Sequence, residues 1–333
     1  MKFTLKNIIV PSIPLAVILV GTCCAFWISN LFVNYSIITP NQSNIIVDGI
    51  QSVIRPNSLF SNILSGIITL LNAFLLAQFN NKYTIIRTRT FLPILIFLIL
   101  MGSWNETHIL NGSHFALTLF ILALFFFFEM YRDPNASEHA FMGSFLISAA
   151  SLMVHPLVFV IPVCWLGFIM LKSLSLRTFL ASVFGTLTPW ILYISGIYIL
   201  NPKFDISKIY NIFNITINID YSLSSYSLPT IIYFVAMVIF MIIGLLGLSS
   251  STHSDAVHTR TKINFIMLLF FAITIIAFLF KDEFASTLPL IALFYSILIS
   301  HPFTLIQNKF YSNLFFIFCL LNVAYFISYY YIL

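Results

Sequence analysis

Six polar side chains in this sequence are of the types that acid–base chemistry and anion binding need. A carboxylate or an imidazole can accept a proton from an attacking group. A cation beside them can stabilise the negative charge on a leaving phosphate. We assign candidate catalytic roles to Asp48, Glu106 and His108, and candidate substrate-binding roles to Arg55, His114 and His155. Gathered in one place, they would form a transferase site for a lipid-linked phosphate donor.

The densest of these positions is the run Trp104-Asn105-Glu106-Thr107-His108. The same residues are also what a solvated loop contains, so an ordinary polar loop is the competing interpretation. Trp104 by itself suits an anchor at a membrane–water interface. The sequence leaves these alternatives open.

No cofactor or metal site is indicated. The motifs GxxxxGK[ST], GxGxxG, GxSxG and HExxH do not occur. The cysteines Cys23, Cys24, Cys164 and Cys319 form neither a CxxC pair nor a Cys/His cluster with metal-ligand spacing. We therefore expect no cofactor and no metal ion.

The candidates must be positioned by a very apolar chain. Of its 333 residues, 60% are hydrophobic and 8% are charged, and the mean hydropathy is +1.02. Soluble domains carry roughly 25% charged residues, and disordered chains have high charge and low hydrophobicity. The composition predicts a protein whose partner is the lipid bilayer. The basic residues form no clustered patch, so nucleic acid is not a predicted partner.

Charge-free apolar runs predict an all-α, polytopic integral membrane protein, since one membrane helix needs about 20 apolar residues. We expect about 11 transmembrane helices in a single transmembrane domain, residues 1–333. The predicted spans are 8–33, 58–79, 90–104, 114–130, 141–154, 157–171, 179–199, 228–249, 263–280, 288–300 and 314–331. The spans near 90, 141 and 288 are short enough to be tilted or partly re-entrant.

The basic residues predict the orientation, because Lys and Arg are retained on the cytoplasmic side of short loops. A cytoplasmic N-terminus and an external C-terminus place eleven basic residues inside: Lys2, Lys6, Lys82, Arg87, Arg89, Arg132, Lys172, Arg177, Arg260, Lys262 and Lys309. The same threading places four outside: Arg55, Lys203, Lys208 and Lys281. All six candidate site residues then lie on the external face.

Two external segments, 34–57 and 201–227, are long enough to fold over the membrane surface. The first has apolar residues at helical spacing, which predicts an amphipathic helix at the interface. It carries both Asp48 and Arg55. The second alternates more like extended chain.

Few polar residues fall inside the spans. Glu129 lies at the inner end of one, where Arg132 is spaced to pair with it. Asn72, Thr188 and Asn322 are expected to make hydrogen bonds between helices. The spans therefore offer no obvious ionisable path across the membrane.

The central third resembles an uncharacterised family of polytopic inner-membrane proteins from Bacteroidota. The resemblance covers about residues 60 to 200 and rests on RTRTFLP at 87–93, FMGSFL at 141–146, His155-Pro156, the stretch 172–185 and Thr188-Pro189. His155 and Lys172 depart from the family pattern, where an aromatic residue and an arginine are expected. The resemblance implies a bacterial inner (cytoplasmic) membrane and no established activity.

Three functions are compatible with this sequence. The favoured hypothesis is a non-catalytic component of envelope biogenesis that works with an envelope protein partner. The alternative is an enzyme that is similar in layout to C-type membrane glycosyltransferases. Such an enzyme would use a polyprenyl-phosphate-linked donor and the loop that carries Asp48, although the usual paired acidic motif is missing. The third hypothesis is a secondary transporter.

Overall fold

The computed structural model describes residues 13–31, 59–86, 90–200, 227–251, 256–305 and 309–332. Within these ranges the regular structure is helical, and no β-strand occurs. Asp48 and Arg55 lie outside the described residues, together with the whole predicted loop 34–57 and residues 201–226 of the second loop.

Each predicted span overlaps a helix of the described chain. The helices are α2 (Ile13–Leu31), α4 (Leu59–Tyr83), α5 (Leu92–Ser103), α6 (Gly112–Glu129), α7 (Ser137–Ser151), α8 (Val160–Met170), α9 (Leu176–Leu200), α11 (Leu228–Ser251), α12 (Val257–Leu279), α13 (Phe284–Leu305) and α14 (Lys309–Ile332). Short 3-10 turns are η1 (Asn105–Thr107), η2 (His155–Phe159) and η5 (Lys281–Glu283).

Seven helices of the described chain are long and apolar enough to cross a membrane, which supports a membrane protein. They are α4, α6, α9, α11, α12, α13 and α14. Shorter apolar helices lie in α2, α5 and α8, and α7 has 15 residues. The number of about 11 crossings therefore stays a prediction.

The predicted short span near 288 belongs to a longer helix. α13 has 22 residues and continues through Pro289 and Pro302. Proline usually interrupts a helix because it cannot donate a backbone hydrogen bond. Here nearly every residue from Ser286 to Phe303 is buried, so neighbouring helices hold this segment in place.

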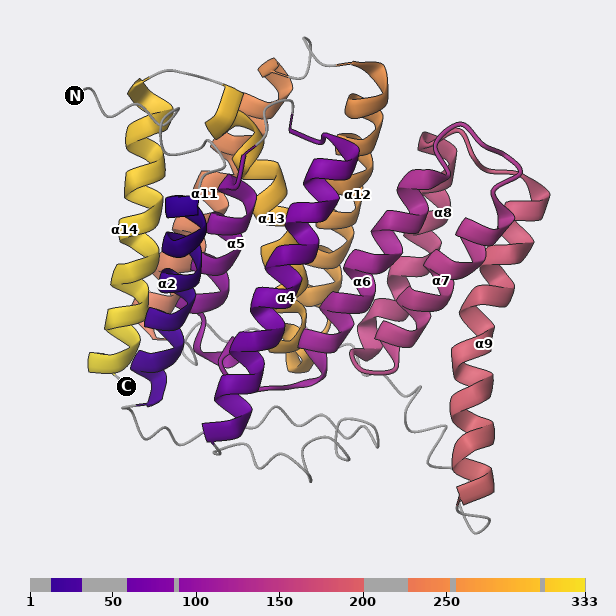
Figure 1. The fold of residues 1–333 in the computed structure, drawn as a ribbon, viewed down its shortest axis with the longest axis horizontal. Helices are drawn as coiled ribbons and strands as arrows, with labels where there is room; N and C mark the ends of the chain where they lie inside the picture. The colour runs from indigo at the N-terminus through magenta and orange to yellow at the C-terminus, as the bar shows by residue number, and fades with distance from the viewer. Residues whose placement is uncertain are drawn as a thin grey trace.

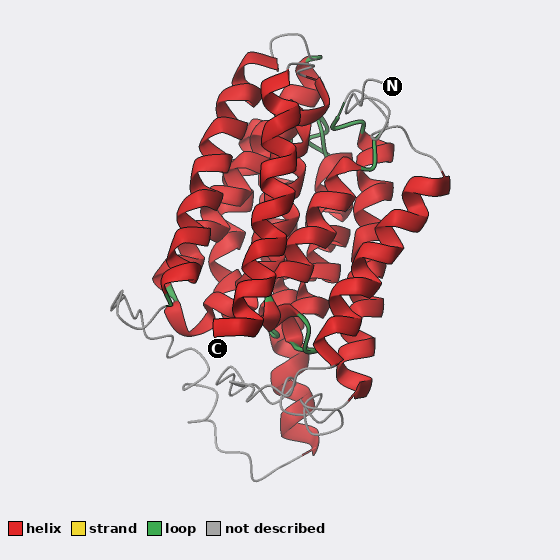
Figure 2. Ribbon diagram, turned by 90° about the vertical axis from the view of Figure 1, so that its left-hand side faces the viewer, coloured by secondary structure: helices red, strands yellow, loops and turns green. Residues whose placement is uncertain are grey.

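α13 lies at the centre of the bundle, with α5, α6, α11 and α12 packed around it (Figure 1). On one side, α4 packs on α5 and α6, α2 on α4 and α5, and α14 on α5 and α11. On the other side, α7 lies between α6 and α9, and α8 packs against α12. Viewed from the side, the helices run roughly along one common direction (Figure 2).

Aromatic rings fill the spaces between these helices. Phe120 of α6 meets Phe294 of α13 edge-on, with ring centroids 5.6 Å apart. Phe127 of α6 meets Phe168 of α8 in the same manner at 5.3 Å. Such edge-to-face contacts match the charge distribution of the rings and add to the packing that holds membrane helices together.

Successive helices alternate in direction, so their connections gather at two ends (Figure 1). One end, which we name the basic end, carries the described residues Lys82, Arg132, Lys172, Arg177, Arg260, Lys262 and Lys309. The opposite end, which we name the junction end, carries η1, η2 and η5. This segregation agrees with the predicted topology, and the orientation in a membrane stays a prediction.

Candidate functional site at the α5–α6 junction

The candidates Glu106, His108 and His114 lie at the connection between α5 and α6. After α5 the chain makes the turn η1, and α6 then begins after Asn111. The Asn111 side chain accepts a hydrogen bond from the Ser113 amide at 3.2 Å and caps the helix. The Thr107 hydroxyl donates to the carbonyls of Met101 and Trp104. Local hydrogen bonds therefore fix the shape of this connection.

His114 ties the beginning of α6 to η1. Its ring is buried, and its Nε2 lies 2.9 Å from the carbonyl oxygen of Thr107. A carbonyl can only accept, so Nε2 carries a proton. Nδ1 lies 2.9 Å from Oδ1 of Asn111. A neutral ring has one N–H, so Nδ1 cannot also donate to this oxygen. Both ring nitrogens nevertheless face protein oxygens in the buried junction.

His108 ties the same connection back to α5. Its Nε2 lies 3.0 Å from the carbonyl oxygen of Gly102 and must donate to it. The other nitrogen, Nδ1, is buried and has no hydrogen-bond partner within the described chain. Burial lowers the pKa of His108 to about 4, the bond to Gly102 opposes this shift, and nearby His114 adds to it. The imidazole is therefore neutral near pH 7.

Trp27 of α2 completes this cluster. Its ring lies against that of His108, with centroids 4.6 Å apart, and its Nε1 donates to the Ser65 hydroxyl at 2.8 Å. The Ser65 hydroxyl in turn lies 2.6 Å from the His108 carbonyl oxygen. The side-chain oxygen of Asn62, one turn before Ser65, is buried and has no partner among the described residues. This cluster connects α2, α4 and the junction.

Glu106 has a different environment from the two histidines. Its side chain is exposed in η1, whereas the hydrogen bonds of the His108 and His114 rings go to backbone carbonyls and Asn111. The structure thus brings the three residues to one connection without a hydrogen bond between Glu106 and either ring. Their catalytic and substrate-binding roles stay predictions.

His155 lies elsewhere at the junction end. It begins η2, between α7 and α8, and its side chain is half-buried. Asp48 and Arg55 are outside the described residues. A convergence of all six candidates on one cavity is therefore not part of the described structure.

The expectation that Trp104 anchors the chain at an interface is wrong. Its side chain is buried, and its Nε1 donates to the Tyr233 hydroxyl at 3.1 Å. That hydroxyl donates to the Asn322 side chain at 2.9 Å, and the Ser103 hydroxyl donates to the same oxygen at 3.1 Å. This buried network joins α5, α11 and α14. In the sequence, the only indication of this network was Asn322, a single side-chain amide within an apolar run.

Two of the three predicted interhelical hydrogen-bonding residues are confirmed. Asn322 joins the network just described, and Asn72 of α4 bonds to His114 and Thr118 of α6. Thr188 is the exception, since its hydroxyl donates to the Phe184 carbonyl in its own helix at 2.7 Å. A hydroxyl can satisfy itself on its own helix, whereas a side-chain amide has too many polar atoms to do so.

The predicted pairing of Glu129 with Arg132 is also wrong. Glu129 is the last residue of α6, so Arg132 does not lie one helical turn further on. The Arg132 amide instead donates to the Leu171 carbonyl at 2.9 Å. Glu129 pairs with Lys82 of α4 at 2.6 Å and accepts from the Tyr83 hydroxyl at 2.9 Å.

Lys262 of α12 lies beside this ion pair. Its Nζ lies 4.7 Å from the ring centroid of Tyr83, 5.5 Å from that of Phe128 and 5.9 Å from that of Tyr131. Aromatic faces attract a cation when it is partly removed from water. These contacts offset part of the cost of removing the Lys262 ammonium group from water. The sequence pattern did not predict them.

No group of three or more His, Cys, Asp or Glu side chains in the described ranges has the arrangement of a metal site. In comparisons with known proteins, no protein-family model, curated protein or solved structure matches this chain. The resemblances to the Bacteroidota family and to the layout of C-type glycosyltransferases therefore stay predictions.

Proposed function

We propose that this chain is a non-catalytic, multi-spanning component of a bacterial inner-membrane assembly. In this proposal the basic end faces the cytoplasm, and a different membrane protein packs against the part of α9 near the junction end. The observation that carries the proposal is that α9 extends beyond α7 and α8, the helices that contact it (Figure 1).

α9 packs mainly against α7. Trp165 of α8 also contacts it: its Nε1 donates to the Ser182 hydroxyl at 2.9 Å, and its ring lies 4.8 Å from that of Phe179. α7 and α9 run in the same direction, and each of two hydroxyl contacts between them joins residues that are 38 positions apart in the sequence. Ser144 lies 2.7 Å from Ser182, and Ser148 donates to the Thr186 carbonyl at 2.6 Å. In this register the end of α7 at Ser151 lies level with Pro189.

The rest of α9, residues 189–200, continues for about 17 Å past that point at about 1.5 Å per residue. It reaches beyond the neighbouring helices at the junction end (Figure 1). Its large apolar side chains are exposed: Ile191 by 61%, Leu192 by 59% and Ile199 by 76%. An apolar helix that projects past its own bundle needs a cover of protein or lipid.

The junction supports a non-catalytic function. The ring nitrogens of His114 each lie 2.9 Å from a protein oxygen, His108 Nε2 donates to the Gly102 carbonyl, and both rings are buried. These contacts stabilise the connection and leave the imidazoles little access to a substrate.

Site-specific photo-crosslinking in intact cells tests the proposal. A photoreactive amino acid replaces Leu192 of α9 or, as the matched control, Ile239 of α11, which is 52% exposed. We expect one defined protein adduct from position 192, none from position 239, and co-purification of the same partner in stoichiometric amount with the unmodified chain. A crosslink to a second copy, or to lipid alone, would contradict the proposal.

A further inference from the structure

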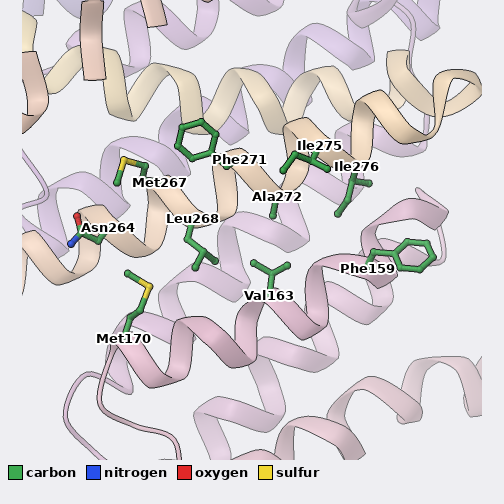
Figure 3. A pocket seen from close by; sticks show the side chains of 10 residues that line it. All are labelled: Phe159, Val163, Met170, Asn264, Met267, Leu268, Phe271, Ala272, Ile275 and Ile276. Atoms are coloured by element: carbon green, nitrogen blue, oxygen red, sulfur yellow. The ribbon is translucent and has the colours of Figure 1, made fainter. Parts of the chain in front are cut away.

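A groove on the membrane-facing side of the molecule lies between α8 and α12 and does not include residues of the α5–α6 connection or of α9. Its volume is about 610 Å³, within the range of about 300 to 1,000 Å³ that small-molecule sites occupy. Its walls are apolar apart from Asn264 and include Val163, Met267, Leu268 and Phe271 (Figure 3).

The two ends of the groove differ. Because α8 and α12 run in opposite directions, the end of α8 lies beside the first part of α12 (Figure 3). At one end Met170 faces Asn264, and at the other Phe159 approaches Ile276 (Figure 3). The Phe159 end is closed by the ring of Phe280, stacked on Phe159 at a centroid distance of 5.4 Å. The Met170 end opens toward the basic end of the molecule.

The length of the groove distinguishes a lipid chain from a protein helix as its occupant. From Asn264 to Ile276 it follows α12 for about 18 Å, at about 1.5 Å per residue. One leaflet of a bilayer core is about 15 Å deep, half of the total of about 30 Å. The groove therefore matches the acyl region of a single leaflet, whereas a transmembrane helix would need a surface nearly twice as long.

Arg260 and Lys172 lie in the chain close to the residues at the open end. Arg260 lies one turn before Asn264 on the same face of α12. Its Nε is buried and has no hydrogen-bond partner in the described chain. Lys172 follows α8 two residues after Met170 and is exposed.

The backbone of Arg132, in another connection, meets the end of α8, and its guanidinium lies 5.3 Å from the Tyr131 ring centroid. Its amide bond to the Leu171 carbonyl, at 2.9 Å, joins the α6–α7 connection to the end of α8. Two acidic residues also lie in this region, Asp133 beside Arg132 and Glu138 in the first turn of α7. Of these charged residues, Arg260 is the one on the face of α12 that carries the groove residue Asn264.

We infer that this groove is a binding site for an anionic phospholipid of the leaflet at the basic end. One acyl chain lies between α8 and α12, and the phosphate lies at the open end, within reach of Arg260 and the side-chain amide of Asn264. A phosphodiester accepts hydrogen bonds from both groups, and basic pockets between transmembrane helices are typical sites for anionic headgroups. The site does not depend on a partner at α9.

Native mass spectrometry of the full chain in detergent tests the inference. The protein is titrated with phosphatidylglycerol and with phosphatidylcholine of identical acyl chains. We expect phosphatidylglycerol to bind at least fivefold more tightly, since each cation near a headgroup contributes about a fivefold preference. Arg260→Gln should remove most of that preference. Lys309→Gln, an exposed cation of the same end on α14, should leave it unchanged.

A second pair of variants tests the apolar part of the site and remains informative if Arg260→Gln fails to fold. Ala272→Phe fills the groove and should lower the occupancy of both lipids several-fold. Val323→Phe, at a 42% exposed position of α14, should not. Inorganic phosphate at millimolar concentration should not displace phosphatidylglycerol. Equal losses in Arg260→Gln and Lys309→Gln, undiminished binding to Ala272→Phe, or displacement by phosphate would each overturn the inference.

Discussion

At the scale of single residues, two buried histidines, His108 and His114, link the turns of the α5–α6 junction. His108 ends the run Trp104–His108 and His114 begins the predicted span 114–130, and both become buried hydrogen-bonding groups of the α5–α6 junction. A buried imidazole must stay neutral or find a counter-charge, because an isolated charge in an apolar interior is very costly. Acid should therefore destabilise the junction before it affects the apolar helix contacts.

We predict that thermal stability falls as the pH drops from 6.5 to about 4. The pKa of His108 is about 4 in the folded chain and about 6.5 in an unfolded chain. The unfolded state therefore takes up the proton first, and its uptake across this window disfavours folding by roughly 3 kcal/mol. The measurement is the unfolding midpoint in detergent at several pH values.

The matching variants are His108→Phe and His258→Asn. The first removes one of the two buried imidazoles of the junction and should reduce the loss of stability in acid, with His114 accounting for what remains. The second changes an exposed histidine at the basic end and should leave the acid profile unchanged. If both variants kept the full acid sensitivity, His108 would not be its source.

At the scale of helices, α7 and α9 are held close by small residues. A Cβ atom added to Gly185 would lie 2.4 Å from the Phe141 carbonyl oxygen, so α9 can approach the α7 backbone only with glycine at this position. Serine hydroxyls at 144, 148 and 182 complete the contact. Small residues and hydroxyls are what bring membrane helices together, since lipid tails are as apolar as the side chains.

We predict that Gly185→Leu separates α9 from α7. The clash is with backbone, which cannot move aside as a flexible side chain can, so the unfolding midpoint should fall by several degrees. Gly196→Leu is the control, because a Cβ at Gly196 meets no atom within 4 Å, and leucine favours a helix over glycine by up to about 1 kcal/mol. Equal destabilisation by the two changes would show that the contact at Gly185 is not what holds α9.

At the scale of the whole molecule, all the described cations except Lys281 lie at one end of the bundle. The described basic end holds Lys82, Arg132, Lys172, Arg177, Arg260, Lys262 and Lys309. Retention of Lys and Arg in the cytoplasm orients such a bundle in the membrane. The same end contains the mouth of the groove between α8 and α12, so orientation also decides which leaflet supplies the bound lipid.

We predict that reporters fused after Arg89 and after Lys262 remain in the cytoplasm. A reporter fused after Lys281, at the junction end, should be exported. The measurement pairs a reporter that is active only in the cytoplasm with one that is active only outside it. Export of the reporters after Arg89 and Lys262 would reverse the predicted topology and place all the candidate residues of the junction on the cytoplasmic side.

The sequence by itself determined the class of this protein and the places of its helices. Charge-free runs of suitable length leave little alternative to apolar helices, because a backbone in lipid must satisfy its own hydrogen bonds. A side-chain amide in an apolar span also needs hydrogen-bond partners, which predicted that Asn72 and Asn322 bond to other helices, as they do.

Only the tertiary structure decided which polar groups meet. Glu129 bonds to Lys82 of another helix and not to Arg132, its neighbour in the chain. Trp104 is buried on Tyr233 rather than placed at an interface, and α13 continues through two prolines. These outcomes depend on which helices pack side by side, and an apolar surface facing a neighbour has the same composition as one facing lipid.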